Sequence, residues 1–391
     1  MDEATLNSGL SFLPSEDEQA MIDAVRRYCQ NEIRAIADHY GEDYIPTEAM
    51  RDILKRLTEF GFVNGPISVD HGGLGLCWKT FGLLLEELFA VNASIGITAF
   101  IQTMVATLAE GLFSDELRER YLPRILSADL IGCIGISEPD VGSNVVEIKT
   151  RAKTVEGGYA IFGEKTWISN GAYADLCICV ARTGDKPTEL DLFLVERSAS
   201  PFEAKNIHKM ALNGTSTAQL FFDDCRVPEV NRLTREGKGL RQVAGMFGVS
   251  RPLVGIFGVG VARAALDAAV AYSQDRRQHG KPIAGHQLIS SYLSEMKTKL
   301  DASRLLTLRA LDLLDRGVRS ESESAMAKWF ATELAVEICD KALQVHGGNG
   351  VTSEFPVERL YREARVFTIP EGTTEINKLI IGRDLTGISA F

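Results

Sequence analysis

The spacing of apolar residues divides the chain into a helical beginning, a β-rich middle and a helical end. Ser15 and Glu18 form the pattern of a capping box, and the apolar residues that follow recur every three or four positions. The same period predicts further helices at 47–60, 79–90, 95–112 and 114–126. The first third of the chain is therefore expected to be helical.

Near residue 130 the pattern changes to short apolar runs separated by turn residues. Runs at 148–155 and 159–167 flank Gly157 and Gly158, a pattern that predicts a β-hairpin. Further strands are expected at 176–181, 190–195 and 219–222. These strands together predict a compact β segment of about 100 residues.

After Gly239 the helical period returns. It predicts helices at 240–272, 287–316, 320–345 and 375–385. Pro252 is expected to interrupt the first of these helices. Gly255, Gly258 and Gly260 lower its helix propensity, so we expect another helix to pack closely against it there.

Length and composition narrow the class of protein. A chain of 391 residues, 45% apolar and 24% charged, is long enough for a large core and for two or three domains. The changes of period place a helical domain at 1–129, a middle β domain at 130–236 and a helical domain at 237–391. Global disorder, a disulfide mini-protein and a fibrous repeat are excluded. The net charge of −11 disfavours general nucleic-acid binding, which needs clustered cations.

The cysteines, the histidines and the beginning of the chain bear on its location. Seven cysteines and six histidines are dispersed without metal-ligand spacing, and Cys177 and Cys179 fit core strand residues better than a metal or redox pair. The start at Met1 lacks the basic and apolar regions of a signal peptide. Apolar stretches such as 253–262 are too short or too rich in glycine to span a membrane. We therefore expect a reduced cytoplasmic protein with no structural metal and no membrane insertion.

Four polar, glycine-containing segments stand out against this background. They are 135–144, 165–171, 276–282, and 344–350 together with 369–376. Each has an ordinary structural interpretation, such as a loop, a half-buried strand aromatic, a solvated helix end or a helix stop. The chain lacks a dinucleotide fingerprint after a strand, a phosphate loop and a nucleophile elbow. A bound cofactor would therefore be held in another way.

In this order and spacing the four segments resemble the acyl-CoA dehydrogenase flavoprotein family. The resemblance runs from Ser15 to Arg383, and its strongest parts are 137–139, 167–171, 344–350 and 371–373. It implies a mainly α fold with a central β domain: an N-terminal helical domain, a middle β-barrel-like domain and a C-terminal four-helix bundle. It also implies bound FAD and a homotetramer or homodimer.

The resemblance assigns roles to individual residues. Ser137 would face the pyrimidine side of the flavin, Ser169 would bond flavin N5, and Trp167 would pack on the ring. Arg276 would hold the FAD pyrophosphate across a subunit interface, where a guanidinium fork suits phosphate. The implied cofactor set is Ile134, Ile136, Ser137, Gly142, Ser143, Trp167, Ile168, Ser169, Arg276, Gln278, His279, Gln287, Gln344, Val345, Gly347, Gly348, Thr373 and Glu375.

Glu371 matches the catalytic base of the family. The α-proton of a thioester is weakly acidic, so a base is required, and a buried carboxylate has a raised pKa that suits the task. Some members carry the base at the position that corresponds to Ser250, which cannot serve as one. The residues implied to contact the thioester or its pantetheine arm are Ser143, Phe247, Arg251 and Gly372.

The chain departs from the usual family pattern at several positions. Asn144 stands where Asp is usual, His279 replaces Phe, Pro370 replaces a frequent aromatic residue and Glu375 replaces Gln. Gly248 stands where an acidic residue commonly bonds pantetheine. The catalytic core is intact, whereas recognition of the carrier is altered.

The implied activity is α,β-dehydrogenation of a short- or medium-chain acyl-CoA in fatty acid metabolism, with electrons passed to an electron-transfer flavoprotein. One alternative is dehydrogenation of an acyl or aminoacyl group on a carrier protein in secondary metabolism. Another is a flavin oxidase or monooxygenase on the same scaffold, against which Glu371 argues. The third is a scaffold role without turnover, which the retained base and flavin residues disfavour.

Overall fold

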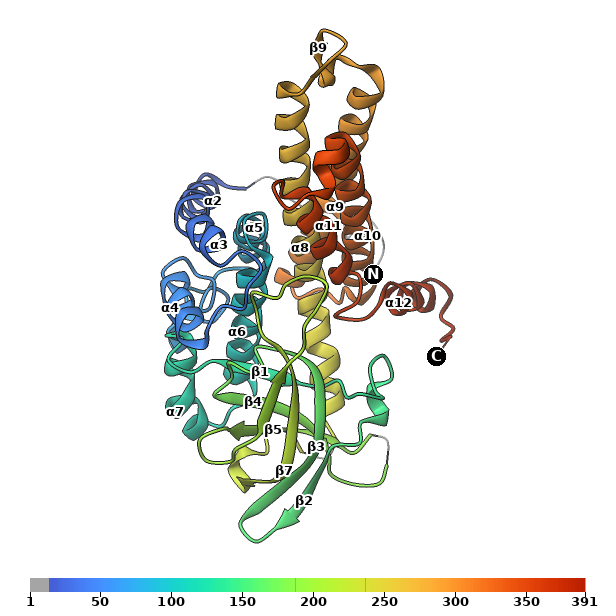
Figure 1. Cartoon of the computed structure of the whole chain (residues 1–391). Helices are drawn as coiled ribbons and strands as arrows, with labels where there is room; N and C mark the ends of the chain where they lie inside the picture. Colours follow the sequence, from blue (N-terminus) through green and yellow to red (C-terminus); the bar gives the residue numbers. More distant parts are fainter. Residues whose placement is uncertain (1–13, 187, 236, 391) are drawn as a thin grey trace. The chain divides into compact units, whose positions relative to one another are not determined.

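The computed structural model describes residues 14–186, 188–235 and 237–390 (Figure 1). The start of the chain, on which the signal-peptide interpretation rests, lies outside the described residues. The order of elements confirms the expected fold class, with helices before and after a β segment that spans 132–228. All seven cysteines are free, and Cys177 and Cys179 lie in a buried strand, as the interpretation of them as core residues requires.

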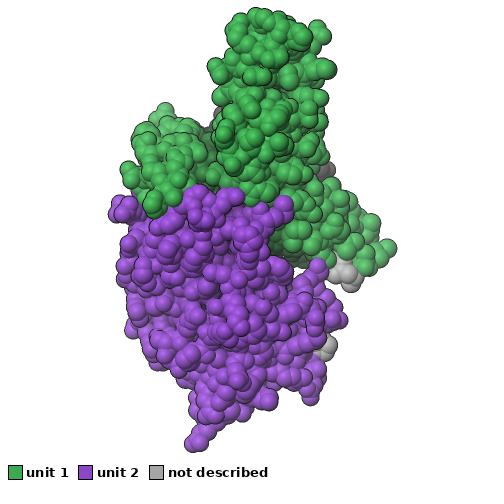
Figure 2. Space-filling view, viewed as in Figure 1, with its two compact units in different colours: residues 1–39, 77–93, 247–391 green, residues 40–76, 94–246 purple. Residues whose placement is uncertain are grey.

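The chain folds into two compact units, each assembled from separate stretches of sequence (Figure 2). Among the described residues, the first unit comprises 14–39, 77–93 and 247–390, and the second comprises 40–76, 94–186, 188–235 and 237–246.

The second unit combines helices with one sheet. Its helices are α4 (Thr47–Thr58), most of α6 (Ala93–Leu112) and α7 (Asp115–Leu126). The strands are β1 (Gly132–Gly135), β2 (Arg151–Val155), β3 (Gly158–Ser169), β4 (Leu176–Arg182), β5 (Leu190–Glu196), β6 (Glu203–Asn206) and β7 (Thr217–Pro228). They are ordered β1-β4-β2-β3-β7-β6, with β5 paired to β4. The sequence pattern misses β1 and β6, because four residues are too few to show a period.

Asp191 anchors the sheet to the segment after β7. Its buried carboxylate accepts hydrogen bonds from Arg232 Nη2 at 2.6 Å and from Thr234 Oγ1 at 2.9 Å. Arg232 also donates to the hydroxyl of Tyr159 on β3 at 2.7 Å. One buried carboxylate therefore holds β5, β3 and the approach to the next helix in register.

Asp191→Ala is expected to lower the free energy of unfolding by about 3–5 kcal/mol, because it leaves the guanidinium of Arg232 without its buried partner. Urea unfolding followed by circular dichroism measures this change. The control is Arg235→Ala, which breaks an exposed pair with Glu229 and should change the free energy by less than about 1 kcal/mol. Equal effects of the two variants would contradict this account.

The first unit is helical. Its helices are α2 (Glu16–Tyr28), α3 (Arg34–Tyr40), α5 (Trp78–Phe89), most of α8 (Gly239–Asp275), α9 (Gln287–Asp315), α10 (Glu321–His346), α11 (Val357–Phe367) and α12 (Thr374–Thr386). A two-stranded ribbon, β8 (Arg277–Gln278) and β9 (Lys281–Pro282), links α8 to α9 (Figure 1).

The expected interruption of α8 at Pro252 is wrong, since this helix of 37 residues runs through the proline without a break. Burial of the residues on both sides outweighs the local cost of the proline. The expected close packing at the glycines is confirmed. A Cβ atom on Gly258 would lie 3.0 Å from the carbonyl oxygen of Ala331, and one on Gly255 would lie 3.1 Å from that of Ala327, so α10 packs against the backbone of α8.

Two helices, α6 and α8, are long and apolar enough to cross a bilayer by length and composition alone. The sequence expectation that no stretch is long enough is therefore too strict. In the folded chain 67% of the apolar window of α6 and 72% of that of α8 is buried, as in the core helices of a globular protein.

Candidate active site

Glu371 lies in a tight turn between α11 and α12. Its backbone is left-handed, with φ at 57°, and Gly372 follows with φ at 88°. A left-handed residue other than glycine is strained and persists only where its surroundings hold it. Thr373 then caps α12 by accepting a hydrogen bond from the amide of Ile376. The turn therefore presents a carboxylate at the start of a helix in a strained conformation.

The carboxylate of Glu371 meets the middle of α8. The hydroxyl of Ser250 donates a hydrogen bond to Glu371 Oε2, and Arg251 Nε donates to the carbonyl oxygen of Glu371 at 3.2 Å. The guanidinium of Arg251 lies 5.4 Å from the ring centre of Phe247. The structure thus brings together Glu371, Gly372, Arg251 and Phe247, and it places Ser250, the alternative base position, against the same carboxylate.

The surroundings of Glu371 suit a base. Burial raises the pKa of its carboxyl above the ordinary 4.5, and the Ser250 hydroxyl, Arg251 and Lys328 partly oppose that rise. Burial also lowers the pKa of Arg251. A carboxylate whose pKa is raised and that remains partly accessible is a stronger base than an ordinary exposed one.

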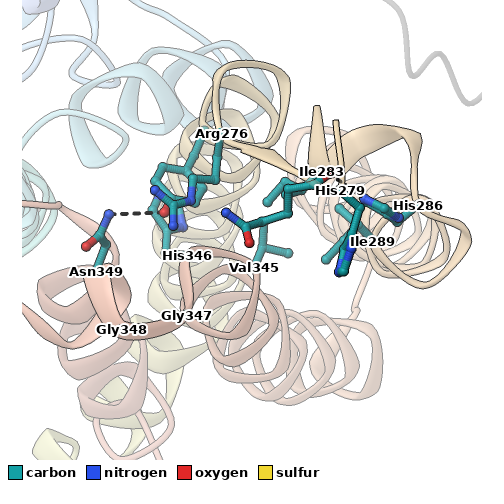
Figure 3. Close-up of a pocket in the computed structure, with 12 residues that line it drawn as sticks. Arg276, His279, Ile283, His286, Ile289, Val345, His346, Gly347, Gly348 and Asn349 are labelled. Carbon is teal, nitrogen blue, oxygen red and sulfur yellow. Dashed lines mark hydrogen bonds between the residues drawn. The ribbon is translucent and has the colours of Figure 1, made fainter. Parts of the chain in front are cut away.

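A second group of expected residues lines a cavity of about 490 Å³ in the first unit (Figure 3). Arg276, Gln278 and His279 come from the end of α8 and the ribbon, whereas Val345, Gly347 and Gly348 come from the end of α10. Gly347 has φ at 59° and ψ at −133°, a conformation that glycine alone adopts readily. The structure therefore joins two segments that lie about 70 residues apart in the sequence.

Two aromatic rings close one side of this cavity. Tyr272 and His346 stack with ring centres 4.3 Å apart, and Asn349 Nδ2 donates to the hydroxyl of Tyr272 at 3.0 Å (Figure 3). Gln287 and Gln344, which the sequence also assigns to the cofactor, are exposed and do not line it. Glu375 is exposed in the first turn of α12.

A third group lies in the second unit, where the loop after β1 meets the end of β3. Lys165 Nζ donates to the carbonyl oxygen of Ile136 at 3.0 Å and to Glu138 Oε1 at 2.9 Å. The amide of Thr166 donates to the carbonyl oxygen of Ser137 at 2.9 Å. The structure thus joins the first two sequence segments. Of the other expected residues here, Ile134 and Ser169 are half-buried, Ile168 is buried, and Gly142 and Ser143 are exposed.

Trp167 lies at a bulge in β3. Its side chain is exposed, whereas a regular strand aromatic would be half-buried. Trp167 has φ at 61°, lies where the pairing register with β7 shifts, and is 62% exposed. Ser169 lies two residues after Trp167 on β3, and the amide of Thr166, next to Trp167, bonds the carbonyl oxygen of Ser137. A broad exposed ring close to two partly accessible serines suits a planar ring system with polar edges, such as a flavin. The exposed guanidinium of Arg276 likewise suits a pyrophosphate. The residues present therefore fit FAD.

Comparisons with known proteins agree with this geometry. Models of the acyl-CoA dehydrogenase N-terminal, middle and C-terminal domains match residues 15–129, 133–225 and 237–386. The chain belongs to the acyl-CoA dehydrogenase family. It is an FAD-dependent oxidoreductase that acts on the CH–CH group of acyl thioesters.

Individual relatives match this dehydrogenase over most of their length. An acyl-CoA dehydrogenase of Bacillus subtilis is 34% identical over 95% of this chain and 99% of its own. The Caffeyl-CoA reductase-Etf complex subunit CarC of Acetobacterium woodii is 33% identical over 89% of this chain and 96% of its own. A glutaryl-CoA dehydrogenase from Mycobacterium smegmatis in complex with FADH2 superposes with a TM-score of 0.90 at 28% identity, over 100% of this chain and 98% of its own.

Sequence reasoning misses three side chains that support the sites of this dehydrogenase. Lys165 holds the Ser137 loop, whereas Lys328 and Asn377 donate to the carbonyl oxygen of Gly372, each at 2.8 Å. One signal was available, because Lys328 occupies the same helical face as the small residues Ala331 and Ala335. A lysine on an apolar helix face indicates a buried cation that needs fixed partners.

Proposed function

We propose that this dehydrogenase introduces an α,β double bond into a short- or medium-chain acyl-CoA and passes the electrons to an electron-transfer flavoprotein. The observation that carries the proposal is the carboxylate of Glu371, which is held in a left-handed turn against Ser250 and Arg251 with a raised pKa. The name of the Acetobacterium relative, an Etf complex subunit, supports the choice of electron acceptor.

In the proposed reaction the ionised carboxylate of Glu371 removes a proton from Cα of the thioester. The Cα–H electron pair forms the new double bond as a hydride leaves Cβ, and Glu371 ends protonated. The backbone amide of Glu371 is assigned to polarise the thioester carbonyl, since a donor placed there stabilises the charge that develops on oxygen. The phenyl ring of Phe247 and the guanidinium of Arg251 are assigned to the pantetheine side.

The residues that would hold FAD come from two groups. Ser137, Trp167 and Ser169 would contact the flavin ring. Arg276 would hold the pyrophosphate across a subunit interface, with Gln278 beside it in the cofactor shell. FAD, when bound, supplies the acceptor for the hydride that leaves Cβ.

A screen of thioesters tests the proposal. The enzyme is mixed anaerobically with acyl-CoA thioesters of increasing chain length, and bleaching of the flavin absorbance is recorded. Bleaching by short or medium chains, followed by reoxidation with electron-transfer flavoprotein, is the expected result. Rapid oxygen consumption by the reduced enzyme would favour an oxidase instead, and absence of bleaching by every thioester would overturn the proposal.

A second candidate substrate is an acyl or aminoacyl group on a carrier protein. It rests on Gly248, the position at which an acidic residue is usual. Apart from the adjoining residues and the backbone of α8 itself, no described atom lies within 4 Å of the place where a Cβ atom of Gly248 would sit, so no other side chain takes the place of the usual acidic one. The same screen, repeated with matched acyl-carrier-protein thioesters, distinguishes the two substrates. Faster bleaching by the acyl-carrier-protein thioester than by the acyl-CoA at equal concentration would identify the acyl-carrier protein as the carrier of the substrate.

The raised pKa of Glu371 predicts a pH dependence. Only the ionised carboxylate accepts a proton, so kcat/KM should rise with pH through an apparent pKa above 4.5 and then level off. Steady-state rates between about pH 5 and pH 9 measure this limb. A rate that is already maximal at the lowest pH, with the protein still folded, would contradict the assignment of the base.

We also propose a cytoplasmic homotetramer or homodimer. The seven free thiols support a reducing compartment. Large apolar side chains that remain exposed in the first unit, among them Leu288, Val351 and Leu385, support association with further copies. Sedimentation of the purified protein tests the oligomeric state.

A further inference from the structure

Lys328 is a buried lysine whose ammonium group is fixed to the segment that carries Glu371. Lys328 lies on α10 and is 0% exposed. Lys328 Nζ donates to the carbonyl oxygen of Thr368 at 2.7 Å and to that of Gly372 at 2.8 Å. These carbonyls stand on either side of Glu371, so one ammonium ties both ends of the turn that presents the carboxylate.

Burial of a charged ammonium group costs free energy, because the group loses its hydration. Removal of the ammonium from water lowers the pKa of Lys328 to about 8, although the carboxylates of Glu371, Glu333 and Glu375 oppose the fall. A buried charge is retained when its hydrogen bonds and neighbouring charges stabilise it. A neutral side chain in the core of α10 would avoid the cost, so the charge calls for an explanation beyond packing.

We infer that Lys328 is a positioning residue, which holds Glu371 in its left-handed, base-presenting conformation and stabilises the ionised form of the carboxylate. The inference rests on the proposed function, because it assumes that Glu371 is the base. The strain at Glu371 supplies the reason: a residue at φ of 57° relaxes unless its neighbours fix the chain, and the two carbonyls are the points at which Lys328 fixes it.

The charged groups around Glu371 determine how the ammonium group of Lys328 affects the pKa of that carboxyl. Arg251 on α8 and Lys328 on α10 are the cations that lower the pKa of Glu371 against the larger effect of burial. Lys328 is in turn faced by Glu333 on its own helix, by Glu375 on α12 and by Arg251. Removal of the ammonium should therefore raise the pKa of Glu371 further, since one of two opposing cations is lost.

Lys328→Met tests the inference, because methionine keeps much of the length and removes the charge and the donors. We expect three results in the holoenzyme. Amide hydrogen exchange in the peptide that spans 369–376 becomes faster, the acidic limb of kcat/KM moves to higher pH, and kcat on the plateau falls by about 10- to 100-fold. The exchange measurement does not depend on turnover, and it is repeated on the protein without FAD.

Two control variants distinguish three effects: the loss of hydrogen bonds to the turn, the loss of the positive charge and a general loss of core packing. Asn377→Leu removes a neutral donor to the carbonyls of Gly372 and Thr373, so it should loosen the same peptide and leave the acidic limb in place. Ile338→Ala makes a cavity on α10 ten residues farther on, so it should lower stability without changing either readout. Should Lys328→Met fail to fold, Lys328→Gln replaces it, since its amide keeps a donor without charge.

The outcomes distinguish this inference from the proposed function. Unchanged exchange in 369–376 together with an unchanged acidic limb in a folded Lys328 variant would overturn the role of Lys328. A Lys328 variant that behaves as Ile338→Ala does would show a packing role only, which also overturns it. A wild-type enzyme that no thioester reduces would instead overturn the proposed function, whatever the exchange data show.

Discussion

Glu371→Gln is expected to slow reduction of the flavin by a good thioester by about 10²–10⁴-fold or more. Glutamine keeps the shape of the side chain and can still accept the hydrogen bond from Ser250, but it cannot take up the α-proton. The backbone amide that is assigned to the thioester carbonyl is preserved, so thioester binding should survive. The loss should therefore appear in the rate of the chemical step and not in affinity.

Stopped-flow absorbance under anaerobic conditions measures this rate. FAD content and thioester affinity are determined on the same preparation to show that the site is intact. Glu358→Gln is the matched control, because Glu358 pairs with Arg362 on α11 and contacts neither the Glu371 turn nor the cavity at Arg276. Reduction of the Glu371→Gln variant at close to the wild-type rate would place the base elsewhere.

The same substitution has a consequence for stability. Because the pKa of Glu371 is raised in the folded protein, its ionisation favours unfolding as the pH rises through that pKa. Glutamine does not ionise, so the variant should be at least as stable as the wild type at pH 8. Urea unfolding at pH 5 and pH 8 measures this, with the larger advantage of the variant expected at pH 8.

Arg276→Ala should weaken FAD binding by about 10- to 100-fold, the effect of losing one or two hydrogen bonds to a charged group. The exposed guanidinium lines the cavity between the end of α8 and the glycines after α10, where a fork of donors suits a pyrophosphate (Figure 3). The variant should also dissociate more readily, since the resemblance places this site at a subunit contact.

Titration of the apoprotein with FAD and sedimentation of the holoprotein measure the two effects. The neighbouring Arg277 provides the control, because its Nη2 donates to the carbonyl oxygen of Gly280 and its side chain does not line the cavity. Arg277→Ala should keep its FAD. If both variants bind FAD as tightly as the wild type, the pyrophosphate site is misplaced, and if only sedimentation is unchanged, the interface assignment is wrong.

Most helices could be predicted from the sequence because an amphipathic stripe is a local property. The close packing at Gly255 and Gly258 could also be predicted from the sequence. Glycine lowers helix propensity, so glycines inside a long helix indicate that another helix packs closely there. The helix α11 was missed although Val357, Leu360, Ala364 and Phe367 are buried at helical spacing. It is only 11 residues long and follows a glycine-rich turn, so its apolar stripe is short and borders a segment without helical period.

The candidate site could likewise be predicted only in part from the sequence. The order and spacing of a few motifs were enough to single out Glu371, Ser137, Trp167 and Arg276, because each belongs to a short segment whose residue types already limit its chemistry. Which groups surround those residues depends on contacts between distant segments. Ser250 reaches Glu371 across 121 residues and Lys328 reaches Gly372 across 44, so neither contact leaves a trace in local periodicity.

Tertiary packing therefore decided what the motifs could not. The pattern of side chains states which residues prefer to be buried, but it does not state which buried groups meet. The continuity of α8 through Pro252, the exposure of Trp167 at a bulge and the fixing of the Glu371 turn by a buried ammonium all follow from how helices and strands pack. Their energies come from burial and from hydrogen bonds between segments, and these terms outweigh the local preferences on which a sequence pattern depends.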